Sequence, residues 1–76
     1  MSDLSPFLRA DRWLQQLFQS RAAATGGVIR RKRDDIERLV GWGRFTRELE
    51  RRGYRAIENA GLVIIFCNQE HVTIIR

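Results

Sequence analysis

Few side chains of this sequence could carry out covalent chemistry. There is one cysteine, Cys67, and one histidine, His71, and the short stretch between them could form a turn that brings them together. A cysteine hydrolase needs this pair together with an orienting group, an oxyanion hole and a cleft. A chain of 76 residues has little room for a cleft. We therefore expect Cys67 to be a small buried hydrophobic residue and His71 a turn residue, and we predict a protein that is not an enzyme.

The same residues fall short of a metal or cofactor site. One cysteine, one histidine and the adjacent Glu70 do not complete the four-ligand set of a zinc site. The phosphate-binding glycine patterns are absent, and the pairs Gly26-Gly27 and Gly41/Gly43 are typical of turns and caps. We predict neither a metal nor a cofactor.

Cellular context follows from the cysteine count and from hydropathy. A single cysteine excludes an internal disulfide, which favours a reducing, cytoplasmic setting. The first residues include an acid where a signal peptide has bases, and no apolar run approaches the roughly 20 residues of a membrane span. We expect a cytoplasmic protein without a membrane span.

Positive charge is the strongest functional signal. The formal net charge is +5, and the segment from Val28 to Arg55 holds ten bases and five acids, which accounts for all of it. Four of these cations are consecutive, and such a run is either a solvated surface or a surface that meets negative charge. The best candidates for nucleic-acid contacts are Arg30, Arg31, Lys32, Arg33, Arg44, Arg47 and Arg51. RNA or another polyanion is the first partner predicted, and an acidic protein surface is the alternative.

A second candidate surface lies in the N-terminal part. Ser5-Pro6 is a helix start, and apolar residues recur at helical spacing up to Gly26-Gly27, which predicts an amphipathic helix over 5–25. Its apolar stripe either covers one face of a sheet or docks on a protein partner. The docking alternative would use Trp13, Leu14, Leu17 and Phe18.

The remaining elements position the cations. Residues 28–53 are predicted to be a basic segment with two short helices on either side of Gly41-Trp42-Gly43, and a short strand is possible near 28–31. Asp34 is the expected cap of the first of these helices. Gly53, followed by Tyr54, is expected to close the second in a left-handed conformation.

Residues 54–76 are predicted to form a three-stranded antiparallel meander of YRAIE, LVIIFC and HVTIIR. LVIIFC is the densest apolar run, so we expect it to be the central strand with both of its faces covered. HVTIIR would then be an edge strand, through which a homodimer is possible. The prediction is a single α+β domain over 1–76, with helices layered on one face of the sheet.

The stretch ELERRGYRAIENAGLVIIFCNQEHVTII, residues 48–75, resembles the core of HicA-type RNA-cleaving toxins. The resemblance implies a dsRBD-like fold, in which a helix ending in glycine leads into a hairpin and a third strand. That family carries a catalytic histidine just after the turn glycine, whereas Gly61 here is followed by Leu62 and Val63. The cleavage chemistry therefore does not carry over. The whole chain also resembles small uncharacterised alphaproteobacterial proteins.

Overall fold

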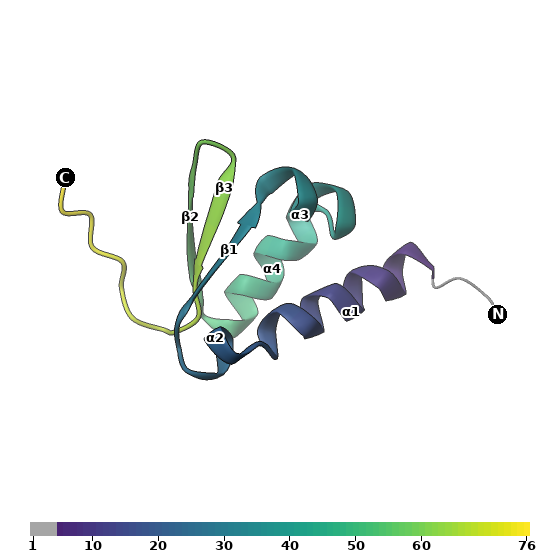
Figure 1. Ribbon diagram of the computed structural model, residues 1–76, viewed down its shortest axis with the longest axis horizontal. Helices are drawn as coiled ribbons and strands as arrows, with labels where there is room; N and C mark the ends of the chain where they lie inside the picture. Colours follow the sequence, from purple (N-terminus) through teal and green to yellow (C-terminus); the bar gives the residue numbers. More distant parts are fainter. Residues whose placement is uncertain (1–4) are drawn as a thin grey trace.

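The structure is a computed structural model and describes residues 5–76. It contains four helices and three strands in these residues (Figure 1). In chain order they are α1 (Pro6–Phe18), α2 (Arg21–Ala24), β1 (Val28–Lys32), α3 (Arg33–Leu39), α4 (Trp42–Arg52), β2 (Arg55–Asn59) and β3 (Leu62–Phe66). The predicted α+β class, with an N-terminal helix, short helices and a three-stranded antiparallel sheet, is confirmed.

The strands form one antiparallel sheet in the order β1-β3-β2, so the apolar run LVIIF is central, as predicted. The hairpin between β2 and β3 turns at Ala60 and Gly61, both of which have positive φ (51° and 77°), as a two-residue turn of the type favoured in hairpins requires. The short strand predicted near 28–31 exists as β1 and borders β3 on its other side.

The prediction that HVTIIR forms the third strand of a meander is wrong. Residues 71–76 form no strand and are exposed. The place beside β3 that they would need is taken by β1, which is held along its whole length, from the bond of Cys67 N–H to the Gly27 carbonyl (2.9 Å) to that of Arg33 N–H to the Gly61 carbonyl (2.9 Å). The periodicity of HVTIIR is that of a strand, and HVTIIR is closer to β3 in the sequence than β1 is. The strand that pairs with β3 on this side is nevertheless β1.

The helix predicted over 5–25 is interrupted. Ser5 caps α1 as expected, accepting a hydrogen bond from the Leu8 N–H (3.2 Å). α1 ends at Phe18, and the Ser20 side chain caps a new helix, α2, by accepting from the Ala23 N–H (3.3 Å). A serine side chain satisfies backbone N–H groups more effectively at a helix cap than inside a helix, and this is why the helix is interrupted at Ser20.

The two short helices of the basic segment are present. Asp34 does not cap α3; it lies in the first turn, because β1 runs straight into the helix with Lys32 at the cap position. α4 ends as predicted: Gly53 is left-handed (φ 73°), and the Tyr54 N–H donates to the Leu49 carbonyl (2.9 Å).

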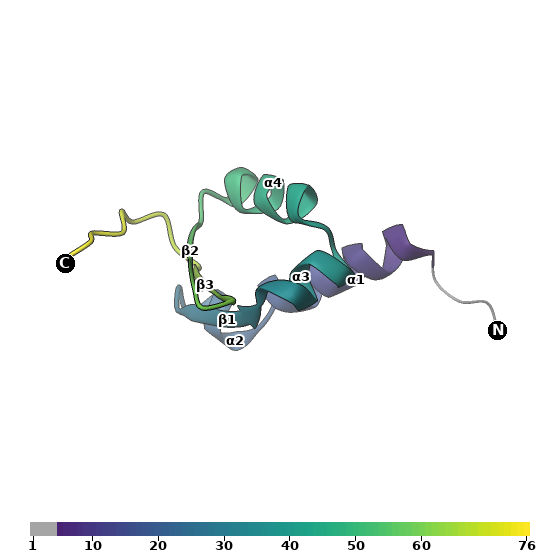
Figure 2. The same ribbon diagram turned by 90° about the horizontal axis from the view of Figure 1, so that it is seen from above.

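All four helices lie on one side of the sheet (Figure 2). The core between these layers is built around fully buried Phe45, Ile36, Ile65 and Val63, with α1 and α2 adding further apolar side chains. The inner face of the sheet is thus covered and its outer face is not, so the expectation that both faces of LVIIFC are covered is wrong. The C-terminal residues leave the domain on this uncovered side (Figures 1 and 2).

Candidate nucleic-acid interface

The uncovered side of the sheet is a surface of nine side chains, which we call the open face. Strand alternation and the register place them in three cross-strand rows. The rows are Val28, Phe66 and Arg55; Arg30, Ile64 and Ile57; and Lys32, Leu62 and Asn59. The open face therefore has an apolar middle, three cations towards its two edges, and no carboxylate.

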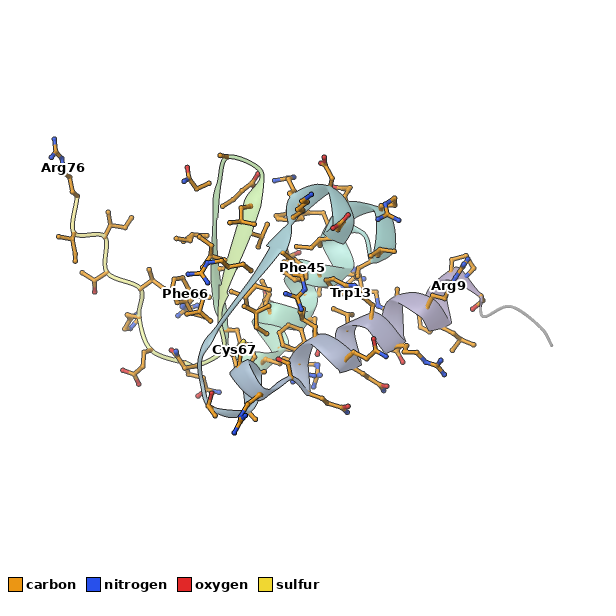
Figure 3. All side chains as sticks on the ribbon, viewed as in Figure 1. Arg9, Trp13, Phe45, Phe66, Cys67 and Arg76 are labelled. Carbon is orange, nitrogen blue, oxygen red and sulfur yellow. The ribbon has the colours of Figure 1, made fainter. Side chains whose placement is uncertain are left out.

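The position of Phe66 is central to this surface. It lies on β3 between Val28 and Arg55, on the opposite side of the strand from the buried core, in which Phe45 lies (Figure 3). Phe66 is half-buried, while Val28 and Ile57 remain 38% and 44% exposed. Directly opposed side chains in an antiparallel pair are about 5 Å apart at Cβ. Phe66 and Arg55 are thus direct cross-strand neighbours on the open face.

The three cations of the open face have no ion pair among the described residues, and their side chains are exposed. Arg30 and Lys32 are two residues apart on β1, about 7 Å. Arg55 is level with Val28 and two strands away, so its backbone lies about 12 Å from that of Arg30 and about 16 Å from that of Lys32. With no acid between them, their fields add. The surface is suited to an extended polyanion.

Three of the seven predicted contact residues are occupied within the protein. Arg33 binds the Glu58 carboxylate (2.5 Å) and stacks on the Trp42 ring at 4.0 Å. Arg44 binds Asp11 (2.8 Å) and donates to the Phe7 carbonyl (3.1 Å), and thereby ties α4 to α1.

The third, Arg51, binds Glu48 (2.5 Å), which Arg52 also contacts (2.6 Å). The hydrogen bond from Arg51, with the nearby positive charges, lowers the pKa of Glu48 against the opposing effect of burial. Arg33 and Arg44 each pair with a carboxylate from another element, whereas Arg51 shares Glu48 with Arg52, so Glu48 compensates only one of these two charges.

The remaining predicted cations are divided between different surfaces. Arg30 and Lys32 point to the open face, whereas Arg31 points to the helix side of β1 and lines a small cavity with Trp13, Gln16 and Leu17. Arg47 lies with Arg44 and Arg51 in a depression on α4 that also contains Glu48 and Glu50. The sheet separates the open face from α4, so the seven residues do not form one binding surface.

The alternative docking stripe on α1 faces inward. Leu14, Leu17 and Phe18 belong to the buried core, and Trp13 packs against it. Phe18 also contacts the Tyr54 ring at 5.6 Å and lies under the Arg52 guanidinium at 4.5 Å. A partner could reach this stripe only if α1 left its own domain.

The candidate nucleophile is buried, as expected. Cys67 is 3% exposed, and burial raises the pKa of its thiol, which keeps it protonated and a poor nucleophile at neutral pH. His71 is exposed, and no hydrogen bond joins the two among residues 5–76. No group of three or more cysteine, histidine or acidic residues in the described part of the chain is placed to hold a metal ion.

Sequence reasoning missed the members of the open face other than Arg30 and Lys32. The alternation that puts Arg55 and Ile57 on one face of β2 is visible in the sequence, and so is the two-sided apolar character of LVIIF. The missing information was the register that sets β1 beside β3, which depends on tertiary pairing.

The site and fold together describe a small α+β protein whose antiparallel sheet has helices on one face and a basic, apolar surface on the other. Comparisons with protein-family models, with curated proteins and with solved structures find no match to this chain. Within the part of the chain that the structure describes, no helix has the length and apolar character needed to cross a lipid bilayer.

Proposed function

We propose that this protein is a non-enzymatic nucleic-acid-binding protein and that RNA or another single strand lies across its open face. The observation that carries the proposal is the composition of that face: Arg55 lies beside Phe66, Arg30 and Lys32 follow along the opposite edge, and the nine side chains include no carboxylate. The cations would contact phosphates, which supply most of the affinity. Phe66 would stack on a base.

A single strand fits this surface better than a duplex. Bases of a duplex are stacked on one another, and a sheet presents no helix or ribbon for a groove. A half-buried ring beside an arginine can still stack on any unstacked base, so the proposal implies weak sequence preference. The mixed-charge depression on α4, with Glu48 and Glu50, is less suited to phosphates.

The test is anisotropy of a labelled single-stranded oligonucleotide with wild type, Phe66→Ala and Phe66→Leu. Loss of one base stack weakens binding by about 1–3 kcal/mol, or roughly 5- to 150-fold. Phe66→Leu keeps an apolar side chain without the ring, so stacking predicts that both variants weaken binding. Full affinity in Phe66→Leu, or equal affinity for duplex and single strand, would argue against stacked bases. No binding at low salt would refute nucleic-acid binding altogether.

The aliphatic content of the open face favours a second candidate, a protein partner with acidic and apolar side chains. Val28, Ile57, Leu62 and Ile64 would bury against it while the cations meet its acids. This candidate predicts that Ile57→Lys abolishes capture of the partner, whereas nucleic-acid binding predicts that the added cation preserves or strengthens affinity for the oligonucleotide.

A further inference from the structure

The C-terminal segment 71–76 is strand-like in sequence but pairs with none of residues 5–70. Ile74 is 82% exposed and Ile75 97% exposed, the highest values of any large hydrophobic residues in the described part of the chain. Alternation places Val72 and Ile74 on one side of an extended segment and Thr73 and Ile75 on the other. Such a segment is suited to completing a sheet.

The free edge of β2 can receive it. The Gly61 carbonyl and the Cys67 N–H bond to β1 residues, so the alternate residues Leu62, Ile64 and Phe66 pair with β2. Their partners in the register are Asn59, Ile57 and Arg55, which leaves the backbone groups of Ala56 and Glu58 directed outward. β1, the other edge, carries Arg30, Arg31 and Lys32, and charged edge strands resist pairing.

A groove beside this edge supplies a place for side chains. It measures about 160 Å³ and runs between α4 and β2, with Trp42, Phe45, Thr46 and Leu49 on one wall and Ala56 and Glu58 on the other. A strand added to β2 would direct every second side chain towards α4. Val72 and Ile74 have the spacing and the apolar character to enter this groove, while Ile75 would lie beside the exposed Ile57 on the outer side.

The chain's own segment 71–76 is badly placed for this edge. β3 is antiparallel to β2, so a segment that turned back after β3 would run parallel to β2. The Asn68 side chain donates to the Gly26 carbonyl (3.1 Å) beside β1, and the Gln69 side chain donates to the Arg52 carbonyl (3.3 Å) just before β2, so the chain reaches the start of β2 but not in the direction for antiparallel pairing. A segment from a second molecule has no such constraint of direction and can pair in the antiparallel sense.

We propose that two copies exchange segments 71–76, each adding a strand to β2 of the other. Every molecule carries both the segment and the edge, so the exchange closes as a two-fold dimer. Apart from the contact of Ile75 with Ile57, the new contacts lie at the sheet edge and on the helix side, so the rest of each open face remains accessible. This dimer does not depend on nucleic-acid binding.

The test is the concentration dependence of mass by sedimentation equilibrium, with wild type, Ile74→Asp, Thr46→Trp and the control Leu8→Asp. Ile74 and Leu8 are both exposed, and Leu8 lies on α1, away from the edge. We expect a wild-type dimer and an unchanged dimer in the control. Removal of a buried isoleucine should raise the dissociation constant by about tenfold or more. Thr46→Trp, which fills the groove, should do the same.

In a mixture of the two variants, the intact segment of the Thr46→Trp molecule can enter the intact groove of the Ile74→Asp molecule. The mixture should therefore form a heterodimer. At a concentration low enough for wild type to be monomeric, circular dichroism melting of each variant should match wild type, because neither Ile74 nor Thr46 is buried in the monomer. A monomeric wild type, a dimer unaffected by either substitution, or a mixture that stays monomeric would overturn the exchange. A monomer whose 71–76 amides are protected from hydrogen exchange would assign the segment to its own sheet instead.

Discussion

Replacement of the three open-face cations by glutamine should change the salt dependence of nucleic-acid binding by a predictable amount. For single strands, log K falls with log salt at about 0.7 for each phosphate neutralised. Three contacts from Arg30, Lys32 and Arg55 therefore correspond to a slope of about −2. Wild-type affinity should fall by roughly 20-fold between 50 and 200 mM salt, which is a fourfold change in concentration.

The matched control removes the same charge from other surfaces. Arg12, Arg21 and Arg47 are exposed and take part in no ion pair of residues 5–76. Their replacement by glutamine lowers the net charge equally, from +5 to +2.

The assay is fluorescence anisotropy of a labelled single-stranded oligonucleotide over a series of salt concentrations. The open-face variant should lose about two units of slope and the control variant almost none. Neither variant removes a buried group, so the melting temperature should stay near that of wild type. Equal loss of slope in the two variants would show that net charge acts rather than the open face, and an unchanged slope in the open-face variant would refute the proposed contacts.

Three further substitutions test the account of the fold. Leu14→Asp places an unpaired charge in the core at a residue 5% exposed and should unfold the domain, which circular dichroism would detect; a folded variant would mean that α1 is not part of the core. Gly53→Ala should cost about 1 kcal/mol in urea unfolding, because φ is 73° and the new Cβ would lie 3.3 Å from Gln69 Cγ; an unchanged midpoint would contradict the left-handed cap. Because its folded-state pKa lies below the ordinary 4.5, Glu48 stabilises the fold above that pH, and this contribution is lost as pH falls through the folded-state pKa. Glu48→Gln should therefore lower the melting temperature at pH 7 but little at pH 2 to 3, and an equal loss at both would point to packing instead.

Local signals predicted most of the elements. The Ser5-Pro6 start and the Gly53 stop are short-range features, and both are confirmed. The central position of LVIIF followed from its two apolar faces. The break at Ser20 was missed because one serine in a long helical periodicity gives no sign of whether it caps or continues the helix.

What could not be predicted depends on pairing between distant segments. Either HVTIIR or VIRRK could have paired with β3. VIRRK does so in the structure, held by the hydrogen bonds of Gly27 and Arg33 to the two ends of β3. The partition of the arginines has the same origin. Arg33 and Arg44 look like Arg30 in the sequence, but folding brings each of them a carboxylate from a distant segment. The pair of Arg51 with Glu48 is local to α4.

The most direct test of the central claim is to map amide chemical shifts while a short single-stranded RNA is added to ¹⁵N-labelled protein. The account predicts that the largest changes fall in β1, β2 and β3, around Arg30, Arg55 and Phe66, and that α4 near Arg47 changes little. Changes centred on α4, or none at all up to high RNA concentration, would contradict binding at the open face.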